Sequence, residues 1–300
     1  MIELLKAALF GLVEGVTEWL PVSSTGHMIL LNEFVTLRVS AIFWQMFLVI
    51  IQLGAILAVV VLYWNTIWPF KKDRETGKIR VNRETISLWG KTIVACLPAA
   101  VVGVLADDWL EVHFYNWFVV SVMLIAVGIA FIVVENRNYG KKPVTRRLRD
   151  LTYREALIIG LFQLIAAIFP GTSRSGATIL GGIMIGVSRT VAARFTFILA
   201  IPVMFGASLL KIVKYGLAFS GMEMAILAVG MIVAFVVSIL VIRFLMDYIR
   251  SHDFKVFGWY RIILGLVVII YFTIIQQFSE LCIKLVIITL NRFRSKGFNL

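Results

Sequence analysis

The nine residues "PGTSRSGAT", Pro170 to Thr178, interrupt a region of the chain that is otherwise apolar. The segment "EALIIGLFQLIAAIF" precedes them and "ILGGIMIGV" follows them. Each apolar half is too short to cross a bilayer alone, since a spanning helix needs about 20 residues. Non-helical backbone is tolerated at membrane depth only inside protein or beside a water-filled cavity. The stretch therefore predicts a re-entrant helical hairpin with a polar cavity at its tip.

The composition is that of a polytopic membrane protein. Of the 300 residues, 60% are hydrophobic and 15% are charged, whereas soluble domains are about half apolar and a quarter charged. The net charge of +12 is interpreted as loop charge that sets the topology, which argues against a nucleic-acid partner. Cys96 and Cys282 lie in apolar surroundings and form neither a metal-ligand pattern nor a disulfide framework.

Eight apolar regions divide into two kinds. Two of them, roughly 1–35 and 154–188, are broken near the middle by a proline and a hydroxyl-rich turn. The other six are long enough to span a bilayer: roughly 42–64, 86–106, 116–135, 195–215, 222–246 and 258–276. The sequence thus predicts an all-α polytopic membrane protein with six full spans and two re-entrant helical hairpins.

The two broken regions resemble each other and indicate an internal repeat. "GLVEGVTEWLPVSSTG" aligns with "GLFQLIAAIFPGTSRS" at a constant offset of 149 residues. The alignment pairs Gly11 with Gly160, Glu14 with Gln163, Pro21 with Pro170 and Ser24 with Ser173. Further on, Gly54 in "QLGAIL" corresponds to Gly206 in "MFGASL". Three spans separate the hairpins, and because this number is odd, the hairpins enter the membrane from opposite faces. The repeats are therefore inverted, and a polar site is expected at their interface.

This arrangement divides the chain into four parts. They are the first repeat (1–135), a basic loop (136–153), the second repeat (154–276) and a tail (277–300). The loops 65–85 and 136–153 are basic and lie on one side, which we expect to be cytoplasmic; the acidic stretch "DDWLEVH", 107–113, lies on the other. The sequence leaves the placement of the tail open. Either the tail lies in the membrane interface as an amphipathic helix, or it crosses the membrane as a poor span with Glu280 and Lys284 inside.

The first break, "VEGVTEWLPVSSTGH", contains two carboxylates at helical spacing. Glu14 and Glu18 share one helix face, and carboxylates inside a membrane segment are functional by default. Such a pair binds a divalent cation or holds one proton between its members. The alternative is a pair of surface carboxylates on a frayed interfacial helix.

Hydroxyl groups and a histidine follow these carboxylates at once, in Ser23, Ser24, Thr25 and His27. His27 is suited to act as an acid, a base or a nucleophile near neutral pH. A purely structural histidine is the competing interpretation.

The second break supplies the groups that bind a phosphate. Ser173, Ser175 and Thr178 offer hydroxyl donors. Arg174 has a planar, permanently charged fork that suits phosphate oxygens, and the N-terminus of the helix that follows also attracts anions. These features predict a phosphate group bound at membrane depth. The alternative is that Arg174 is a loop charge at the cytoplasmic face.

Both motifs resemble the signature motifs of the undecaprenyl-diphosphate phosphatase family, also called the bacitracin-resistance family. "EGVTEWLPVSSTGH" and "PGTSRSGAT" carry the resemblance, together with "VIIQLGAILAVVV", Val49 to Val61. The similarity extends to about Tyr271. It implies a bacterial plasma-membrane phosphatase that removes the terminal phosphate of a polyprenyl diphosphate and so recycles the lipid carrier of cell-wall synthesis. The sequence leaves open whether the protein forms a homodimer.

The resemblance also implies roles for individual residues. Glu14 and Glu18 would hold Mg²⁺ or Ca²⁺, and Glu18 would take part in acid–base work. Ser24, His27 or a water molecule would make the attack, and the sequence does not choose among them. The residues expected to bind the substrate are Ser23, Thr25, Ser173, Arg174, Ser175 and Thr178. Arg174 is also expected to be catalytic, because it would balance charge on the phosphoryl group in the transition state. A transporter or flippase of polyprenyl phosphate is the alternative function, because inverted repeats with broken helices also suit alternating access.

Overall fold

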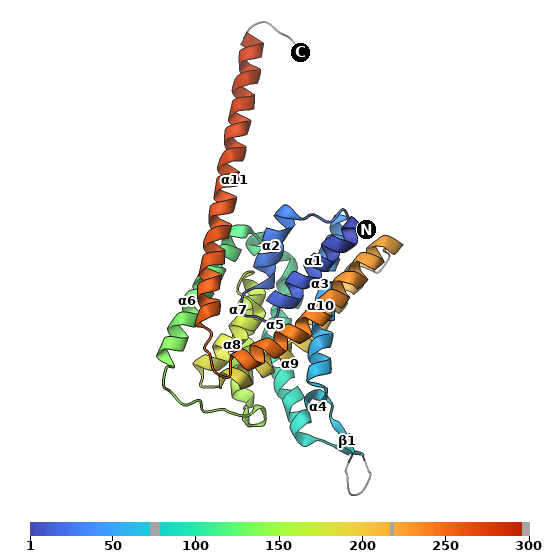
Figure 1. Cartoon of the computed structure of the whole chain (residues 1–300), viewed down its shortest axis with the longest axis vertical. Coiled ribbons are helices and arrows are strands. Elements are labelled where there is room, and N and C mark those ends of the chain that lie inside the picture. Colours follow the sequence, from blue (N-terminus) through green and yellow to red (C-terminus); the bar gives the residue numbers. More distant parts are fainter. Residues whose placement is uncertain (73–78, 217–218, 296–300) are drawn as a thin grey trace.

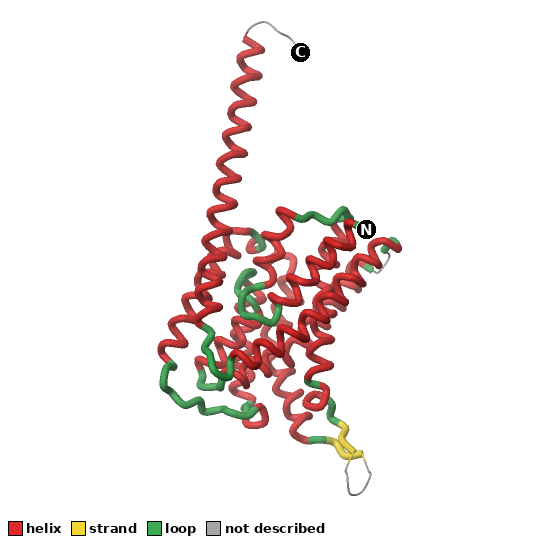
Figure 2. The backbone as a smooth tube through the Cα atoms, in the orientation of Figure 1, coloured by secondary structure: helices red, strands yellow, loops and turns green. Residues whose placement is uncertain are grey.

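A computed structural model describes residues 1–72, 79–216 and 219–295, without the side chains of 72, 107–108, 111, 276 and 278–295. The described chain is almost entirely helical (Figures 1 and 2). Its first half contains α1 (Ile2–Thr17), α2 (Ser24–Phe34), α3 (Ala41–Leu62), α4 (Trp64–Ile67), β1 (Phe70–Lys72), β2 (Ile79–Val81), α5 (Arg83–Phe114) and α6 (Trp117–Arg137). Its second half contains η1 (Leu148–Asp150), α7 (Tyr153–Ile168), α8 (Arg174–Met184), α9 (Arg189–Tyr215), α10 (Gly221–Tyr248) and α11 (Lys255–Ser295).

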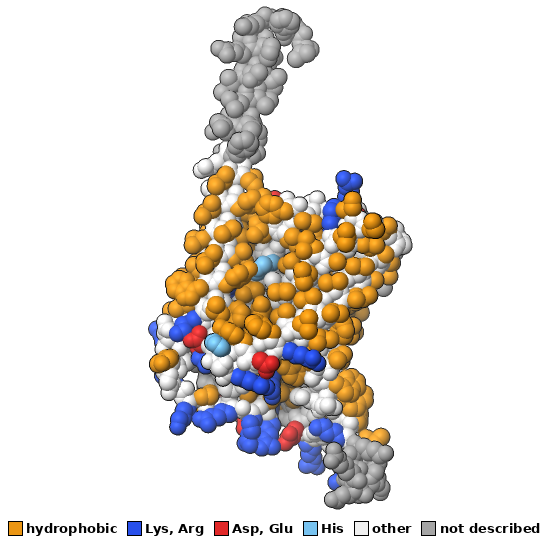
Figure 3. Space-filling view, in the orientation of Figure 1, with side chains coloured by type: hydrophobic (Ala, Val, Ile, Leu, Met, Phe, Trp, Pro, Cys, Tyr) orange, Lys and Arg blue, Asp and Glu red, His pale blue; other side chains and the backbone are white. Residues whose placement is uncertain are grey.

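Six helices of the described chain are long and apolar enough to cross a membrane. They are Ala41–Leu62, Arg83–Ala106, Trp117–Arg137, Arg189–Tyr215, Gly221–Tyr248 and Lys255–Ile275. These helices coincide with the six predicted spans and confirm the prediction of an all-α polytopic membrane protein. On the face that Figure 3 shows, hydrophobic side chains form a broad belt, and lysine and arginine side chains gather at one end of it. We call this the basic end.

The two broken regions each fold as a helix, a break and a second, shorter helix. The positive-φ residues other than glycine in the described chain are Ser23 and Ser173, the residues that precede α2 and α8. Each serine side chain accepts the N–H of a glycine three residues on, Gly26 and Gly176 respectively. Ser23 and Ser173 are therefore structural equivalents, at an offset of 150 residues. The sequence alignment paired Ser24 with Ser173 and was wrong by one residue at this point. The second break contains one residue more than the first, which an alignment without gaps does not allow for.

Each broken pair of helices returns to the end of the bundle at which it began. The backbone N–H of Arg38, beyond α2, donates to Glu3 Oε2 at the start of α1 at 2.9 Å. The N–H of Val144, before α7, donates to the carbonyl of Gly186, beyond α8, at 2.8 Å. The first pair enters from the end that holds the N-terminus and the second from the basic end (Figure 1). Re-entry into a bilayer and the internal repeat stay predictions.

Glycines let the first helix of each pair approach a spanning helix at backbone distance. A Cβ at Gly11 of α1 would collide with the carbonyl oxygen of Gly230 in α10. One at Gly160 of α7 would collide in the same way with that of Ala95 in α5. Small residues at such crossings allow the close van der Waals packing that holds membrane helices together. The aligned glycines Gly11 and Gly160 thus anchor the two broken pairs in the same manner.

The tail continues the last span. The helix α11 runs unbroken to Ser295 and extends beyond the rest of the bundle (Figure 1). The structure thus has no separate interfacial helix between 255 and 295. The side chains of Glu280 and Lys284, and those of Asp107, Asp108 and Glu111 in the acidic stretch, lie outside the description.

The close contact of α3 with α10 gives a test of this packing. At Gly54 an added Cβ would collide with the backbone carbonyl of Met231, whereas at Gly206 it would meet nothing within 4 Å. Overpacking costs about 1–3 kcal/mol, so we expect Gly54→Val to lower the melting temperature in detergent by roughly 2–12 °C. Gly206→Ala is the matched control and should melt at or slightly above the parent temperature. Equal melting temperatures for both variants would contradict the α3–α10 contact.

Candidate functional site

An ion pair joins the two breaks inside the bundle. Arg174 Nη2 lies 2.7 Å from Glu18 Oε1, and the two side chains are only 12% and 7% exposed. The other oxygen of Glu18 accepts the hydroxyl of Ser24 at 2.8 Å. Glu18 follows the last residue of α1, Ser24 begins α2 and Arg174 begins α8. Three of the predicted site residues, from segments about 150 residues apart, are thus in direct contact.

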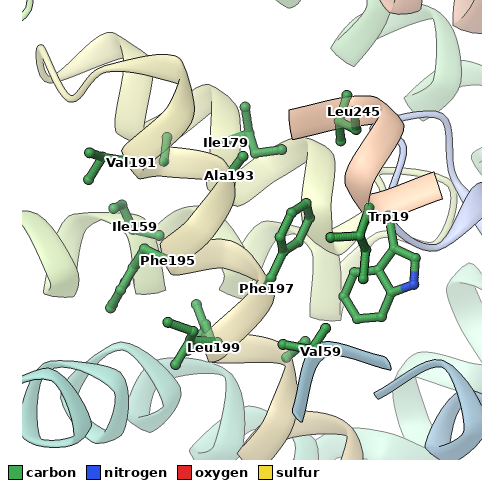
Figure 4. Packing of buried hydrophobic residues seen from close by; sticks show 14 of the residues in the cluster. Trp19, Val59, Ile159, Ile179, Val191, Ala193, Phe195, Phe197, Leu199 and Leu245 are labelled. Carbon is green, nitrogen blue, oxygen red and sulfur yellow. The ribbon is translucent and has the colours of Figure 1, made fainter. Parts of the chain in front are cut away.

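Arg174 is held over a buried aromatic residue of the first break. Its guanidinium carbon lies 6.0 Å from the centre of the Trp19 ring, and Trp19 packs edge-on against Phe197 of α9 (Figure 4). Arg174 Nη1 also donates to the carbonyl of Thr196 at 3.2 Å. Its Nε is buried without a hydrogen-bond partner in the described chain. The guanidinium is therefore positioned on several sides and keeps donor capacity for a further acceptor.

The hydroxyls of the second break bind mainly to protein. Ser175 Oγ lies 3.0 Å from the carbonyl oxygen of Glu18 and 3.1 Å from Ser173 Oγ. Thr178 Oγ1 donates to the carbonyl of Arg174 at 2.9 Å and accepts the hydroxyl of Thr196 at 2.8 Å. Ser175 and Thr178 are buried. In this structure they brace the break, and their expected contacts with substrate stay predictions.

A second arginine, which the sequence analysis did not single out, also bridges the breaks. Arg261 of α11 is fully buried. Its Nη1 donates to the carbonyl of Pro21 at 3.2 Å, and its Nη2 donates to those of Gly171 and Thr172 at 2.8 and 2.9 Å. It lies in a stretch that the sequence analysis treated only as the last span. The signal was available, because an arginine within an apolar span is functional by default.

His27 makes its hydrogen bonds with groups other than the ion pair. Its Nδ1 lies 2.7 Å from the carbonyl of Ser23, so this nitrogen carries the proton, because a carbonyl only accepts. Its Nε2 then accepts the hydroxyl of Tyr260 at 2.7 Å, and the two rings are parallel within 4°. No hydrogen bond joins His27 to Glu18 or Ser24 among the described contacts. Nothing in the sequence distinguished Tyr260 from other aromatic residues at membrane depth.

Glu14 supplies a carboxylate oxygen without a partner. Its side chain is buried one helical turn before Glu18, and its Oε1 has no hydrogen-bond partner in the described chain. The aligned Gln163 of α7 is buried with both amide atoms unpartnered. Such atoms are costly to bury and call for a ligand, a water molecule or an ion. Thr25 is half-buried in the first turn of α2.

The two carboxylates are the candidate cation ligands. No group of three or more His, Cys, Asp or Glu side chains within the described residues could hold a metal ion. A cation at this site would therefore have two carboxylates from the protein and would need further oxygen ligands from elsewhere. Mg²⁺ is often bound in this way, through one or two carboxylates, substrate phosphates and water.

Comparisons with known proteins agree with the resemblance of the two motifs. A family model described as bacitracin resistance protein BacA matches residues 7–267. An undecaprenyl-diphosphatase of Desulfitobacterium hafniense is 61% identical over 273 residues, which cover 91% of this chain and 97% of that protein. Undecaprenyl-diphosphatase 1 of Clostridium acetobutylicum is 58% identical, over 91% of this chain and 99% of that protein. The chain belongs to the bacitracin resistance protein BacA family.

Proposed function

We propose that the protein hydrolyses undecaprenyl diphosphate to undecaprenyl phosphate and inorganic phosphate, and so recycles the lipid carrier of cell-wall synthesis. The names of its relatives support this function. The observation that carries it is the partly buried cluster of Ser24, Glu18 and Arg174. The cluster combines a hydroxyl, a carboxylate within hydrogen-bond reach and a cationic fork inside an apolar bundle, which is what hydrolysis of a lipid diphosphate requires.

The geometry favours Ser24 as the nucleophile. Its Oγ–H already donates to Glu18 at 2.8 Å, so the carboxylate is placed to take the proton. Ser24 Oγ attacks the terminal phosphorus, and the bond from that phosphorus to the bridging oxygen breaks. Undecaprenyl phosphate leaves with the electron pair, and water then hydrolyses the phosphoserine. His27, whose two nitrogens bond to Ser23 and Tyr260, is the less direct candidate for the attack.

Arg174 stabilises the charge of the transferring group. Its Nη2 donates to the Glu18 carboxylate, and its unpartnered Nε adds a donor. Arginine binds phosphoryl oxygens with two parallel hydrogen bonds, and donors fixed in advance lower the barrier because they need no rearrangement. Ser23, Thr25, Ser173, Ser175 and Thr178 complete the proposed substrate site.

Glu14 and Glu18 are the proposed ligands of a divalent cation, Mg²⁺ or Ca²⁺. The buried, unpartnered oxygen of Glu14 fits this role, and carboxylate oxygens are the ligands that both ions prefer. When bound, the cation would neutralise charge on the phosphate oxygens. The oxygens of Glu18 already accept bonds from Arg174 and Ser24, so Glu14 is the more available ligand.

Transport of polyprenyl phosphate is the second candidate function. The two broken pairs enter from opposite ends and meet inside the bundle, an arrangement that alternating access also uses. A transporter needs groups that bind but no pair of nucleophile and base. The contact of Ser24 with Glu18 therefore favours hydrolysis. The membrane is the proposed partner together with the lipid; a homodimer and the lack of a nucleic-acid partner stay predictions.

Replacement of the proposed base tests the function directly. Glu18→Gln cannot take the serine proton, and we expect phosphate release from undecaprenyl diphosphate to fall by about 10²–10⁴-fold. The matched control Glu33→Gln changes an exposed carboxylate of α2 and should keep full activity. In the parent protein, rapid quenching should trap an acid-stable phosphoserine at Ser24. Activity of Glu18→Gln within a few-fold of the parent would remove Glu18 from the mechanism.

The fork of Arg174 is tested by a change that keeps its charge. Arg174→Lys loses the two-pronged geometry, and we expect kcat to fall by roughly 10²–10³-fold, as on loss of a fixed donor to a developing anion. KM should change much less. Arg137→Lys, at an exposed position of the basic end, is the control. A lysine variant with nearly normal kcat would mean that Arg174 serves only to fix the hairpin.

We also propose a bacterial plasma-membrane location with the basic end in the cytoplasm. The test uses a parent with Cys96 and Cys282 replaced, to which single cysteines are added at Lys142 and at His113, both exposed. An impermeant maleimide outside intact cells should label only the cysteine at 113. After the cells are opened, both should react. Labelling at 142 in intact cells would reverse the orientation.

A further inference from the structure

The peptide that precedes the proposed nucleophile is held by a histidine side chain. The carbonyl oxygen of Ser23 lies 2.7 Å from Nδ1 of His27. The backbone N–H of His27 donates to the same oxygen at 3.4 Å, which is longer than is usual for such a bond. The short contact with the imidazole is therefore the one that fixes the carbonyl. Because Ser24 follows directly, a rotation of this peptide would move its hydroxyl away from Glu18, to which it donates at 2.8 Å.

The second break holds the equivalent carbonyl through the backbone alone. At the offset of 150 residues, Ser173 corresponds to Ser23 and Ala177 to His27. The backbone N–H of Ala177 donates to the carbonyl of Ser173 at 2.9 Å, a normal length for this kind of bond. The first break thus uses a side-chain contact where the second uses a backbone contact.

The first break also has less packing around it. The helix α8 is buried from Ser175 to Ile183, whereas the buried residues of α2 are Gly26 and Met28. A backbone with a positive φ, such as that of Ser23, persists only where its surroundings impose it. Since the packing imposes less here, the hydrogen bonds at this break must impose more.

Tyr260 of α11 determines which nitrogen of His27 carries the proton. Its Oη lies 2.7 Å from Nε2, and the two rings are parallel within 4°, with their centres 5.6 Å apart. A tyrosine hydroxyl that donates to Nε2 leaves the proton of the neutral imidazole on Nδ1. In the other tautomer, Nδ1 and the carbonyl oxygen of Ser23 would face each other as two acceptors. Tyr260 therefore favours the tautomer in which His27 holds Ser23.

We infer that Tyr260 is a positioning residue for the proposed hydrolysis and acts through His27 on the peptide before the nucleophile. The hydroxyl of Tyr260 donates to His27, and His27 donates to the carbonyl of Ser23. This chain keeps the hydroxyl of Ser24 on the Glu18 carboxylate. The inference rests on the proposed function, and it gives His27 a supporting role in place of the attack.

The first test removes only the hydroxyl. In Tyr260→Phe we expect kcat for phosphate release to fall by roughly three- to tenfold, the effect of one hydrogen bond, while KM changes less than twofold. Tyr271→Phe removes the same group from the same helix, at a residue whose ring contacts Phe34, and should keep kcat within twofold. Equal effects of the two substitutions would overturn the positioning role.

A double-mutant cycle shows whether the hydroxyl acts through the imidazole. In His27→Asn the amide nitrogen takes about the place of Nδ1 and still donates to the carbonyl of Ser23, but the side chain is too short to reach Tyr260. This variant should keep at least about three times the kcat of His27→Ala, and adding Tyr260→Phe to it should change kcat less than twofold.

Two outcomes of the cycle would overturn the inference. If Tyr260→Phe lowered kcat by the same factor with and without His27→Asn, the hydroxyl would act independently of the imidazole. If His27→Asn and His27→Ala had equal kcat, His27 would act by chemistry that an amide does not replace.

A spectroscopic measurement reports the tautomer without reference to activity. The chain has three histidines, and His113→Gln/His252→Gln changes two exposed ones. Spectra of ¹⁵N-labelled histidine in this full-length double variant, in nanodiscs, therefore report His27 alone. At mildly alkaline pH, where imidazole is neutral, they should show a protonated Nδ1 and an unprotonated Nε2. Adding Tyr260→Phe should raise the fraction with the proton on Nε2 roughly three- to tenfold, whereas adding Tyr271→Phe should not.

These measurements distinguish two kinds of failure. An unchanged tautomer ratio in the Tyr260→Phe protein would overturn the positioning role even if kcat fell. Lack of phosphate release by the parent protein would overturn the proposed function, and the spectra would then still show whether Tyr260 sets the tautomer of His27.

Discussion

The ion pair between Glu18 and Arg174 is the interaction on which the rest of the structure depends. A charge moved from water into an apolar interior costs several kcal/mol even after relaxation, so neither side chain is tolerable there alone. Because the partners come from two segments 156 residues apart, their pairing requires both breaks to meet inside the bundle. The freed backbone groups must then be satisfied as well. Ser175 and Arg261 do this, since they bond to carbonyls that the interrupted helices leave without partners.

The breaks are held by rigid packing around them. Ser23 and Ser173 adopt a positive φ, which costs about 1–3 kcal/mol each and persists only where the surroundings impose it. The contacts of Gly11 with Gly230 and of Gly160 with Ala95 fix the preceding helices at backbone distance. The following helices then start with a defined direction. The first turn of α2 carries Ser24 and that of α8 carries Arg174. Strain and close packing together place these two side chains on Glu18 from different directions.

Much of this arrangement was predictable from the sequence, because it follows from patterns within single segments. Hydropathy located the six spans, and a proline beside hydroxyl residues located the breaks. The spacing of Glu14 and Glu18 predicted that both lie on one helix face; the structure has Glu14 in α1 and Glu18 directly after its last residue. What could not be predicted depends on contacts between segments. Tyr260 reaches His27 only because α11 lies beside α2. The extra residue in the second break leaves no mark in an ungapped alignment. Arg261 was overlooked, although its charge inside an apolar span was a usable signal.

The charges of the site explain why a bound diphosphate would need a compensating positive charge. The junction of the breaks brings two carboxylates, Glu14 and Glu18, near two arginines, Arg174 and Arg261. The formal charges of these four side chains sum to zero, and Arg261 already donates to the carbonyls of Pro21, Gly171 and Thr172. A diphosphate adds further negative charge to an interior where unpaired charge is costly. A proton on Glu14 or a divalent cation beside it would restore the balance. The unpartnered oxygen of Glu14 is where either would bind. In the proposed mechanism, this carboxylate would couple substrate entry to the arrival of a positive charge.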